Sequence, residues 1–334
     1  MTNKIAVVGD GAMGTVCSMM LAENGNAVRL WSAFPEAAEL MATSRRNERF
    51  LPGAVLSDAI EVTGDDEAIF AGVDLAISAV PTQLSRSVWL RLGQHCPASL
   101  PICSVAKGIE NDTLLRPTQI LGDVLTGASD RPVAALSGPS IAPELAKHLP
   151  ATVTIASTDA GFAQLVQRLI NRPYFRVYTN TDLVGVEIAG ATKNVIAIAA
   201  GILDGLKLGA NAKAALVTRG LSEISRLGLA MGARAETFAG LAGVGDLITT
   251  CVSPLGRNRS FGQAVGSGLS VVDALGATDS VVEGVATTTS VVELAKYHNV
   301  EMPITQAVND VLFSEKSPAD AITELMTRPL KPEA

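Results

Sequence analysis

The chain has 334 residues, about the length of two domains of ordinary size. Hydrophobic residues make up 48% of it and charged residues 18%, which is enough material for large buried cores. The net charge of −7 argues against nucleic acid as a partner. No apolar run of roughly 18 residues lacks a polar interruption, so we expect no membrane insertion.

Two further features of the sequence bear on the cellular compartment in which the protein is expected. The first strand-like segment starts almost at the N-terminus, so we expect no signal peptide. The four cysteines form no CxxC pair and have no metal-ligand spacing; they are Cys17, Cys96, Cys103 and Cys251. We therefore expect reduced thiols, no metal site and a cytoplasmic protein.

Short apolar strands alternate with helical patterns in the first half of the chain. The predicted strands are Ile5–Val8, Ala27–Trp31, Val73–Val80, Leu100–Val105, Val133–Ser137, Thr152–Ala156 and Phe175–Tyr178. Helical patterns lie between most of them, at Ala12–Glu23, Pro35–Arg49, Gln83–Gln94 and Thr158–Ile170. Such alternation is typical of a parallel, doubly wound sheet of the Rossmann type.

The pattern changes at about Asp182, where the strand signals stop. Long runs rich in Ala, Leu and Val follow, at Val184–Gly205, Ala212–Met231, Val271–Leu275, Thr287–Tyr297 and Met302–Phe313. We therefore predict an α/β dinucleotide-binding domain over residues 1–181. An all-α domain that binds substrate and carries the catalytic group is predicted over residues 182–334.

A glycine-spaced run follows the first strand directly. Gly9, Gly11 and Gly14 have the spacing G-x-G-x-x-G, and the next residues begin a helical pattern. The first glycine permits a tight turn, the second lets the backbone approach a pyrophosphate, and the third lets the helix pack close to the strand. Free N–H groups at the helix start favour the anion. This segment predicts a site for a nicotinamide dinucleotide.

The end of the second strand bears on the choice between NAD and NADP. An Asp or Glu at this place usually binds the ribose 2′-hydroxyl of NAD. Here the strand Ala27–Trp31 is followed by Ser32 and two apolar residues, with no carboxylate. A serine tolerates a 2′-phosphate, and Arg45 or Arg46 is near enough in sequence to reach it. We predict NADP as the cofactor, with NAD as the alternative.

Lys193 is the lone cation of a nearly uncharged helical run. It either reaches water along a solvated stripe or lies in a partly apolar cleft, where desolvation would lower its pKa into the range of an acid/base catalyst. Asn194 beside it could orient a hydroxyl or carbonyl group. The histidines lie away from the glycine-rich turns, so a histidine-based dehydrogenase is disfavoured.

Three loops could complete such a site. The loop Gly240–Asp246 ends in an aspartate that could cap a helix, hold a substrate hydroxyl or pair with a lysine. Arg257-Asn258-Arg259 follows a turn at a predicted helix start and suits a phosphate, although a solvated charged turn would look the same. Ser137–Ser140 and Lys107-Gly108 end strands, where doubly wound sheets bind ligands.

Taken together, these segments resemble the bacterial-type NAD(P)-dependent glycerol-3-phosphate dehydrogenases. The matching runs occur in family order; they are Gly9–Gly14, Asn47–Gly53, Ala106–Gly108, Ser137–Ser140, Glu187–Asn194, Lys213–Gly220, Gly240–Asp246, Arg257–Arg259 and Val282–Gly284. The resemblance implies an enzyme that interconverts dihydroxyacetone phosphate and sn-glycerol 3-phosphate with NAD(P)H and supplies phospholipid synthesis. It also implies a homodimer.

The resemblance assigns roles residue by residue. The residue matching the family's proton acceptor and donor is Lys193. Substrate positions match Lys107, Gly138, Ser140, Lys193, Asp246, Gly256, Arg257 and Asn258. Cofactor positions match Gly9, Gly11, Ala12, Met13, Gly14, Lys107, Ala142, Arg257, Val281 and Glu283. Met13, Ile141 and Gly256 depart from the family's usual residues; Gly256 offers a backbone N–H in place of a serine hydroxyl.

Two other functions fit parts of the pattern. Another reductase of similar layout, of the hydroxyacid or ketopantoate type, would share the fold, but Arg257-Asn258-Arg259 favours a phosphorylated substrate. A dinucleotide-binding sensor without turnover would share the glycine turn, but it needs no proton donor such as Lys193.

Overall fold

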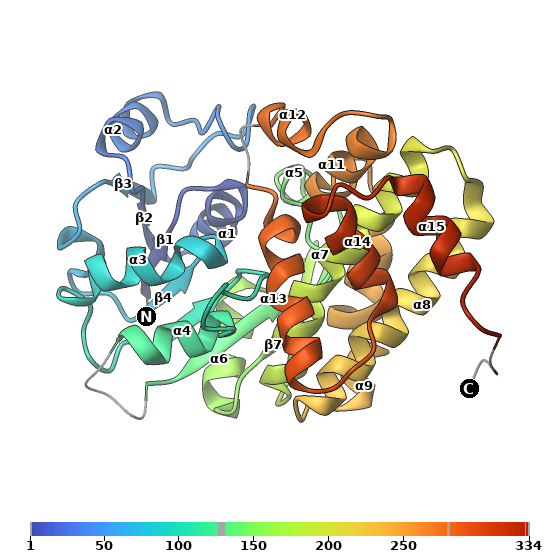
Figure 1. The fold of residues 1–334 in the computed structure, drawn as a ribbon. Coiled ribbons are helices and arrows are strands. Elements are labelled where there is room, and N and C mark those ends of the chain that lie inside the picture. The colour runs from blue at the N-terminus through green and yellow to red at the C-terminus, as the bar shows by residue number, and fades with distance from the viewer. Residues whose placement is uncertain (1, 126–130, 279–280, 331, 333–334) are drawn as a thin grey trace.

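The computed structural model describes residues 2–125, 131–278, 281–330 and 332. An eight-stranded sheet forms the N-terminal part, and helices make up the rest (Figure 1). The strands are β1 (Lys4–Val8), β2 (Ala27–Trp31), β3 (Ile60–Thr63), β4 (Leu75–Ser78), β5 (Ile102–Ser104), β6 (Val133–Ser137), β7 (Ala151–Ala156) and β8 (Phe175–Asn180). They lie in the order β3-β2-β1-β4-β5-β6-β7-β8.

Helices connect the strands and then continue without them. Those within the sheet region are α1 (Ala12–Glu23), α2 (Pro35–Ser44), the 3₁₀ turn η1 (Ala68–Phe70), α3 (Thr82–Gly93), α4 (Pro117–Val124), α5 (Ala142–Leu145) and α6 (Ala160–Ile170). The helical part contains α7 (Leu183–Gly205), α8 (Gly209–Ala230), α9 (Ala235–Phe238), the π-helical turn η2 (Leu241–Gly245), α10 (Asp246–Val252), α11 (Arg257–Gly266), α12 (Val271–Gly276), α13 (Glu283–Tyr297), α14 (Pro303–Phe313) and α15 (Pro318–Met326).

The predicted doubly wound sheet followed by helices is confirmed, with three local differences. β6 and β7 are antiparallel, with Ser137 opposite Thr154, because the chain turns back after the four-residue helix α5 instead of crossing over. The short strand β3 was not predicted, since four residues carry little periodic signal. The helix predicted to reach Arg49 ends at Ser44, because Arg45 adopts a left-handed backbone conformation with φ of 58°.

Helix α7 carries the chain from the sheet into the helical part. It starts just after β8, where the Asp182 carboxylate accepts a hydrogen bond from the Gly185 N–H at 2.9 Å. Two turns later Gly190 lies against Ser137 at the end of β6, where an added Cβ would be 2.7 Å from the serine hydroxyl. The helix therefore passes along β6 and reaches the carboxyl edge of the sheet.

The first turns of α7 are fastened to the sheet region by a buried carboxylate. Glu187 accepts hydrogen bonds from the Thr118 N–H at 2.9 Å and hydroxyl at 2.8 Å, and it pairs with Arg116. Burial raises the pKa of Glu187, and the Arg116 charge opposes that rise. By length and composition α7 could cross a membrane, but 94% of its most apolar window is buried inside the protein, as in a core helix.

Close glycine contacts fix α11 against α7. Gly201 and Gly205 on α7 lie against the α11 backbone, and Gly262 and Gly266 on α11 lie against the α7 backbone, with a spacing of four residues on each helix. A Cβ on Gly262 would lie 2.1 Å from the backbone oxygen of Ile198. Backbones that approach this closely leave no room for a side chain, so the start of α11 has a fixed position relative to α7.

Replacing Gly262 with alanine tests this packing. Gly262→Ala should lower the free energy of unfolding by about 1–3 kcal/mol, because the helices must separate to admit the methyl group. Gly122→Ala is the matched control, since Gly122 lies in α4 with nothing within 4 Å of an added Cβ. It should be neutral or stabilise by up to about 1 kcal/mol. Urea denaturation measures both; equal effects would contradict the packing argument.

Candidate active site

The glycine turn has the geometry that an anion needs. Gly9 has a φ of 108°, and a Cβ there would lie 2.9 Å from the Ala79 oxygen, so only glycine fits. At Gly11 an added Cβ would meet nothing within 4 Å, which leaves the backbone open to a ligand. Among the described residues no side chain caps the start of α1, and its first turn contains no acidic residue. The N–H groups and helix dipole there fit a pyrophosphate.

A buried asparagine supports this turn from the side. The Asn47 amide donates to the Asp10 backbone oxygen at 2.6 Å and to the Thr15 hydroxyl at 2.8 Å. Its own oxygen accepts from the Phe50 N–H at 3.2 Å. Asn47 thus connects the glycine turn with the segment after α2. The segment Asn47–Gly53 is one of the family-like runs of the sequence, but its residue types alone indicated no role.

Lys193 lies at the centre of a hydrogen-bonded group in the helical part. Only 6% of the residue is exposed. Its Nζ is 2.6 Å from Asp246 Oδ1 and 2.6 Å from the Thr250 hydroxyl. An ammonium group has three N–H donors, so one remains without a partner among the described residues. The solvated alternative for Lys193 is therefore wrong, and the buried one is confirmed.

Asp246 joins this lysine to a second one from the sheet edge. Lys107 Nζ is 2.8 Å from Asp246 Oδ2, 2.9 Å from the Gly138 oxygen and 3.3 Å from the Ser140 hydroxyl. All three donors of Lys107 are thus occupied, in contrast to those of Lys193. Gly245, not Asp246, is the N-cap of α10, so the predicted capping role is wrong. The carboxylate is turned to the two ammonium groups instead.

The surroundings lower the pKa values of both Lys193 and Asp246, for different reasons. Burial lowers the pKa of Lys193 to about 8; attraction to Asp246 opposes the change and repulsion from Lys107 adds to it. Burial also disfavours the charged form of Asp246, but the two ammonium groups outweigh it and hold the pKa of that carboxyl below its usual value. The result is a charged acceptor beside a lysine that exchanges protons near neutral pH.

A second polar group lies at the start of α11. The exposed Arg257 donates to the Val281 oxygen at 3.0 Å, and the Asn258 carboxamide oxygen accepts from the Gly284 N–H at 2.9 Å. Arg259 points elsewhere and pairs with Asp204 on α7 at 2.6 Å. The Gly256 N–H donates to the Ser253 oxygen at 3.2 Å. The donors offered here are therefore Arg257, the amide nitrogen of Asn258 and the first N–H groups of α11.

The two groups are neighbours, connected through α7 and α13. The Asn194 amide donates to the Lys107 oxygen at 2.8 Å, and an added Cβ on Gly284 would lie 2.9 Å from the Asn194 oxygen. Glu283, beside Gly284, accepts from the Thr82 N–H at 3.1 Å, where α3 follows β4. Burial raises the pKa of Glu283.

The structure therefore brings most of the predicted site residues to one edge of the sheet. The set around Asp246 contains Lys107, Gly138, Ser140 and Lys193, and the set around α11 contains Gly256, Arg257, Asn258, Val281 and Glu283. Ala12 and Met13 begin α1, and Ala142 begins α5, which packs against it. Thr250 was missed, although its place four residues after Asp246 on a predicted helix puts both on one face.

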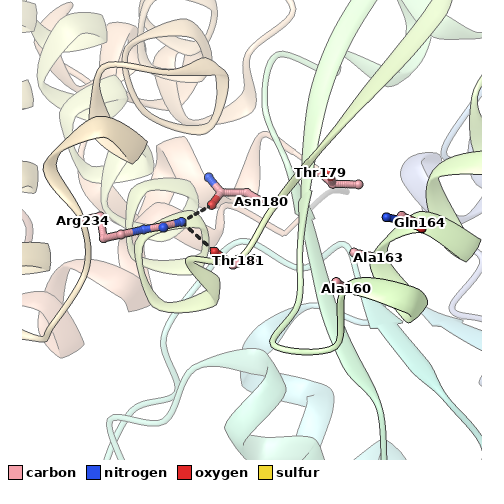
Figure 2. Close-up of a pocket in the computed structure, with 7 residues that line it drawn as sticks. All are labelled: Ala160, Ala163, Gln164, Thr179, Asn180, Thr181 and Arg234. Carbon is pink, nitrogen blue, oxygen red and sulfur yellow. Dashed lines mark hydrogen bonds between the residues drawn. The ribbon is translucent and has the colours of Figure 1, made fainter.

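One pocket lies apart from these residues. Figure 2 shows a cavity of about 260 Å³ lined by Ala160, Ala163, Gln164, Thr179, Asn180, Thr181 and Arg234. Arg234 donates to Asn180 at 2.8 Å and to Thr181 at 2.9 Å. The cavity lies at the end of β8. Because β8 runs antiparallel to β5, this is the edge of the sheet opposite to the one where β5 ends and Lys107 lies. None of the predicted site residues lines the cavity.

Comparisons with known proteins agree with this arrangement. Residues 4–163 match the model of the N-terminus of NAD-dependent glycerol-3-phosphate dehydrogenase, and residues 182–323 match that of its C-terminus. The chain is similar to glycerol-3-phosphate dehydrogenase [NAD(P)+] from Geobacter sulfurreducens, with 47% identity over 100% of this chain and 99% of that protein. The second such enzyme of Salinibacter ruber is 46% identical over 100% of this chain and 97% of that protein.

A solved structure is similar along nearly the whole chain. The crystal structure of glycerol-3-phosphate dehydrogenase from Coxiella burnetii has a TM-score of 0.94 and 38% sequence identity. The match covers 98% of this chain and 99% of that one. Both the sheet and the helical part are therefore shared with a glycerol-3-phosphate dehydrogenase.

The charge balance around Lys193 can be tested directly. In a protein with ¹³C-labelled lysine side chains, one resonance should titrate with a midpoint near pH 8, and it should be missing in Lys193→Met. Asp246→Asn should lower that midpoint, because the carboxylate favours the charged amine. NMR titration measures both. A midpoint that rises in Asp246→Asn would be incompatible with the arrangement described.

Proposed function

The chain belongs to the NAD-dependent glycerol-3-phosphate dehydrogenase family, and we propose that Lys193 is the proton donor and acceptor of its reaction. The enzyme is an oxidoreductase that interconverts dihydroxyacetone phosphate and sn-glycerol 3-phosphate with NAD(P)H. The relatives' names contain both cofactors, which agrees with the prediction of NADP with NAD as the alternative. The same matches favour this reaction over a ketopantoate-type reductase or a sensor.

One observation carries the role of Lys193: it is a buried amine with one N–H left over. Asp246 and Thr250 hold two of its donors and so fix the direction of the third. That donor can bind the ketone oxygen of dihydroxyacetone phosphate. With its pKa near 8, the ammonium can give a proton to that oxygen, and the neutral amine can take one from the alcohol.

Lys107 and Asp246 act on this step through charge and position. Two ammonium groups and one carboxylate leave a net charge of +1 beside the ketone oxygen, which stabilises the negative charge that develops there. Asp246 is the common acceptor that keeps both ammonium groups in place. Lys107 also holds Gly138 and Ser140, so these residues shape the substrate site through it.

The start of α11 is the proposed phosphate site. Arg257 offers a guanidinium group, and the first N–H groups of α11 point out of the helix end. Asn258 holds the start of α13 by its carboxamide oxygen, so its amide nitrogen stays available for the phosphate. A phosphate fixed here and a ketone oxygen at Lys193 orient the substrate at both ends.

The glycine turn and the start of α1 are the proposed cofactor site, with Gly9, Gly11, Ala12, Met13 and Gly14 around the pyrophosphate. Bound NAD(P)H supplies the hydride that the ketone carbon accepts. Lys193 would supply the proton that the substrate oxygen gains in this reduction, so the product would be an alcohol. Ala142, Val281 and Glu283 are proposed to complete the cofactor site beside Lys107 and Arg257.

Three broader expectations extend this proposal. The last strand ends at Asn180 and α7 begins at Leu183, which supports domains over residues 1–181 and 182–334. The four cysteines are free and buried, which supports a reducing, cytoplasmic location. A homodimer and a supply of glycerol 3-phosphate to phospholipid synthesis are proposed from membership of the family.

Removing the amine should stop the chemistry without stopping cofactor binding. Lys193→Ala should lower kcat by a factor of about 100 or more, the usual size of general acid/base catalysis. Absorbance at 340 nm with dihydroxyacetone phosphate follows turnover, and NADH fluorescence checks binding. Lys296→Ala, an exposed lysine on α13, is the control and should be fully active. Near-normal turnover in Lys193→Ala would refute the assignment.

Removing the proposed phosphate ligand should have a different signature. Arg257→Ala should raise KM for dihydroxyacetone phosphate by about tenfold or more, since a charge-assisted hydrogen bond contributes about 1.5–3 kcal/mol. Steady-state kinetics with saturating NADH measures it. Arg226→Ala, on the outer side of α8, should leave KM unchanged. An unaltered KM in Arg257→Ala would place the phosphate elsewhere.

A further inference from the structure

We propose that Asp10 sets the ratio of the two cofactors: its carboxylate accepts the ribose 2′-hydroxyl of NADH and repels the 2′-phosphate of NADPH. This inference rests on the proposed cofactor site at the glycine turn. In most dinucleotide-binding sheets the acidic residue that binds the ribose follows the second strand. Here the carboxylate comes from Asp10, which follows the first strand, β1.

The carboxylate of Asp10 lies at the end of β2 although the residue follows β1. Asp10 Oδ2 accepts a hydrogen bond from the Ser32 hydroxyl at 2.9 Å, and Ser32 is the first residue after β2. An acidic residue at the end of this strand ordinarily binds the ribose 2′-hydroxyl. Asp10 therefore brings a carboxylate to the place that the β2 sequence leaves without one.

The Ser32 hydroxyl is not free to receive a 2′-phosphate. It donates to Asp10 and accepts from the Phe34 N–H at 3.2 Å, and the residue is fully buried. From the sequence, this serine is expected to tolerate the phosphate. In the structure its hydroxyl instead orients the Asp10 carboxylate, which is itself partly exposed at the glycine turn.

The two arginines that the sequence offered for a 2′-phosphate have other partners. Arg45 donates to the backbone oxygens of Ser57 and Ile60, the latter at 2.9 Å. Arg46 pairs with Glu48 at 3.4 Å. The charge of the exposed Arg49 acts on Asp10, and among the described residues the Arg49 guanidinium lies 4.9 Å from the Phe50 ring. Asp10 thus meets a 2′-phosphate with little compensating charge.

Asn47 gives this carboxylate a fixed position. It binds the Asp10 backbone oxygen at 2.6 Å, while Ser32 binds the side chain at 2.9 Å. Both the main chain and the side chain of Asp10 are therefore held on the face where the adenosine half of the cofactor would lie. A carboxylate held in this way contacts whatever group the ribose carries at its 2′ position.

Binding without substrate tests the inference independently of catalysis. Fluorescence titration of the full chain with NADH and NADPH should give a lower Kd for NADH. In Asp10→Asn the Kd for NADPH divided by the Kd for NADH should fall by about tenfold, mainly because NADPH binds more tightly. A unit charge near a surface contributes about 1.4 kcal/mol or more at contact, which corresponds to that factor. Asp10→Ala should shift the ratio in the same direction and weaken NADH as well.

The control is Asp112→Asn, an exposed aspartate with a left-handed φ of 67° that asparagine also adopts. In Asp112→Asn the ratio of the Kd for NADPH to the Kd for NADH should equal that of the unaltered protein. A ratio that is unchanged in both Asp10 variants, or tighter NADPH than NADH in the unaltered protein, would overturn the role of Asp10. If neither cofactor binds the unaltered protein, the proposed function itself fails.

Discussion

One buried carboxylate between two ammonium groups is the interaction on which the site depends. Without Asp246, Lys107 and Lys193 would lie close together, largely out of water, and repel each other. The carboxylate offsets both the desolvation of Lys193 and this repulsion, at distances of 2.8 and 2.6 Å. Lys107 comes from the sheet edge, Lys193 from α7 and Asp246 from α10, so the charge group also connects the two parts of the molecule.

The fold serves this group by bringing three separate segments to one point. Asp182 starts α7, Glu187 fastens it to α4, and Gly190 lets it pass close to β6, so that Lys193 arrives at the carboxyl edge of the sheet. Glycines on α7 and α11 that each lie against the backbone of the other helix then place the first turn of α11 nearby. The proposed phosphate ligand and the proposed proton donor are thus positioned by the same buried helix.

Local signals predicted much of this, and long-range contacts explain what was missed. The glycine turn, the strands and the lone lysine in an apolar helix are visible over a few residues, so sequence reasoning found them. The reversal between β6 and β7 depends on how a short connection packs. Other contacts join residues far apart in the chain or depend on side-chain rotamers. They are the pair of Arg259 with Asp204, the hydrogen bonds of Lys107 and the hydrogen bond between Ser32 and Asp10. No local pattern shows them.

The central claim is that a single amine with a pKa near 8 carries the proton in both directions. The pH dependence of the hydride-transfer step, measured by stopped flow in each direction, tests it most directly. Reduction of dihydroxyacetone phosphate needs the charged amine and should fall as pH rises through about 8, while oxidation of glycerol 3-phosphate needs the neutral amine and should rise over the same interval. Two profiles that stay flat, or that change in the same direction through that range, would contradict the account.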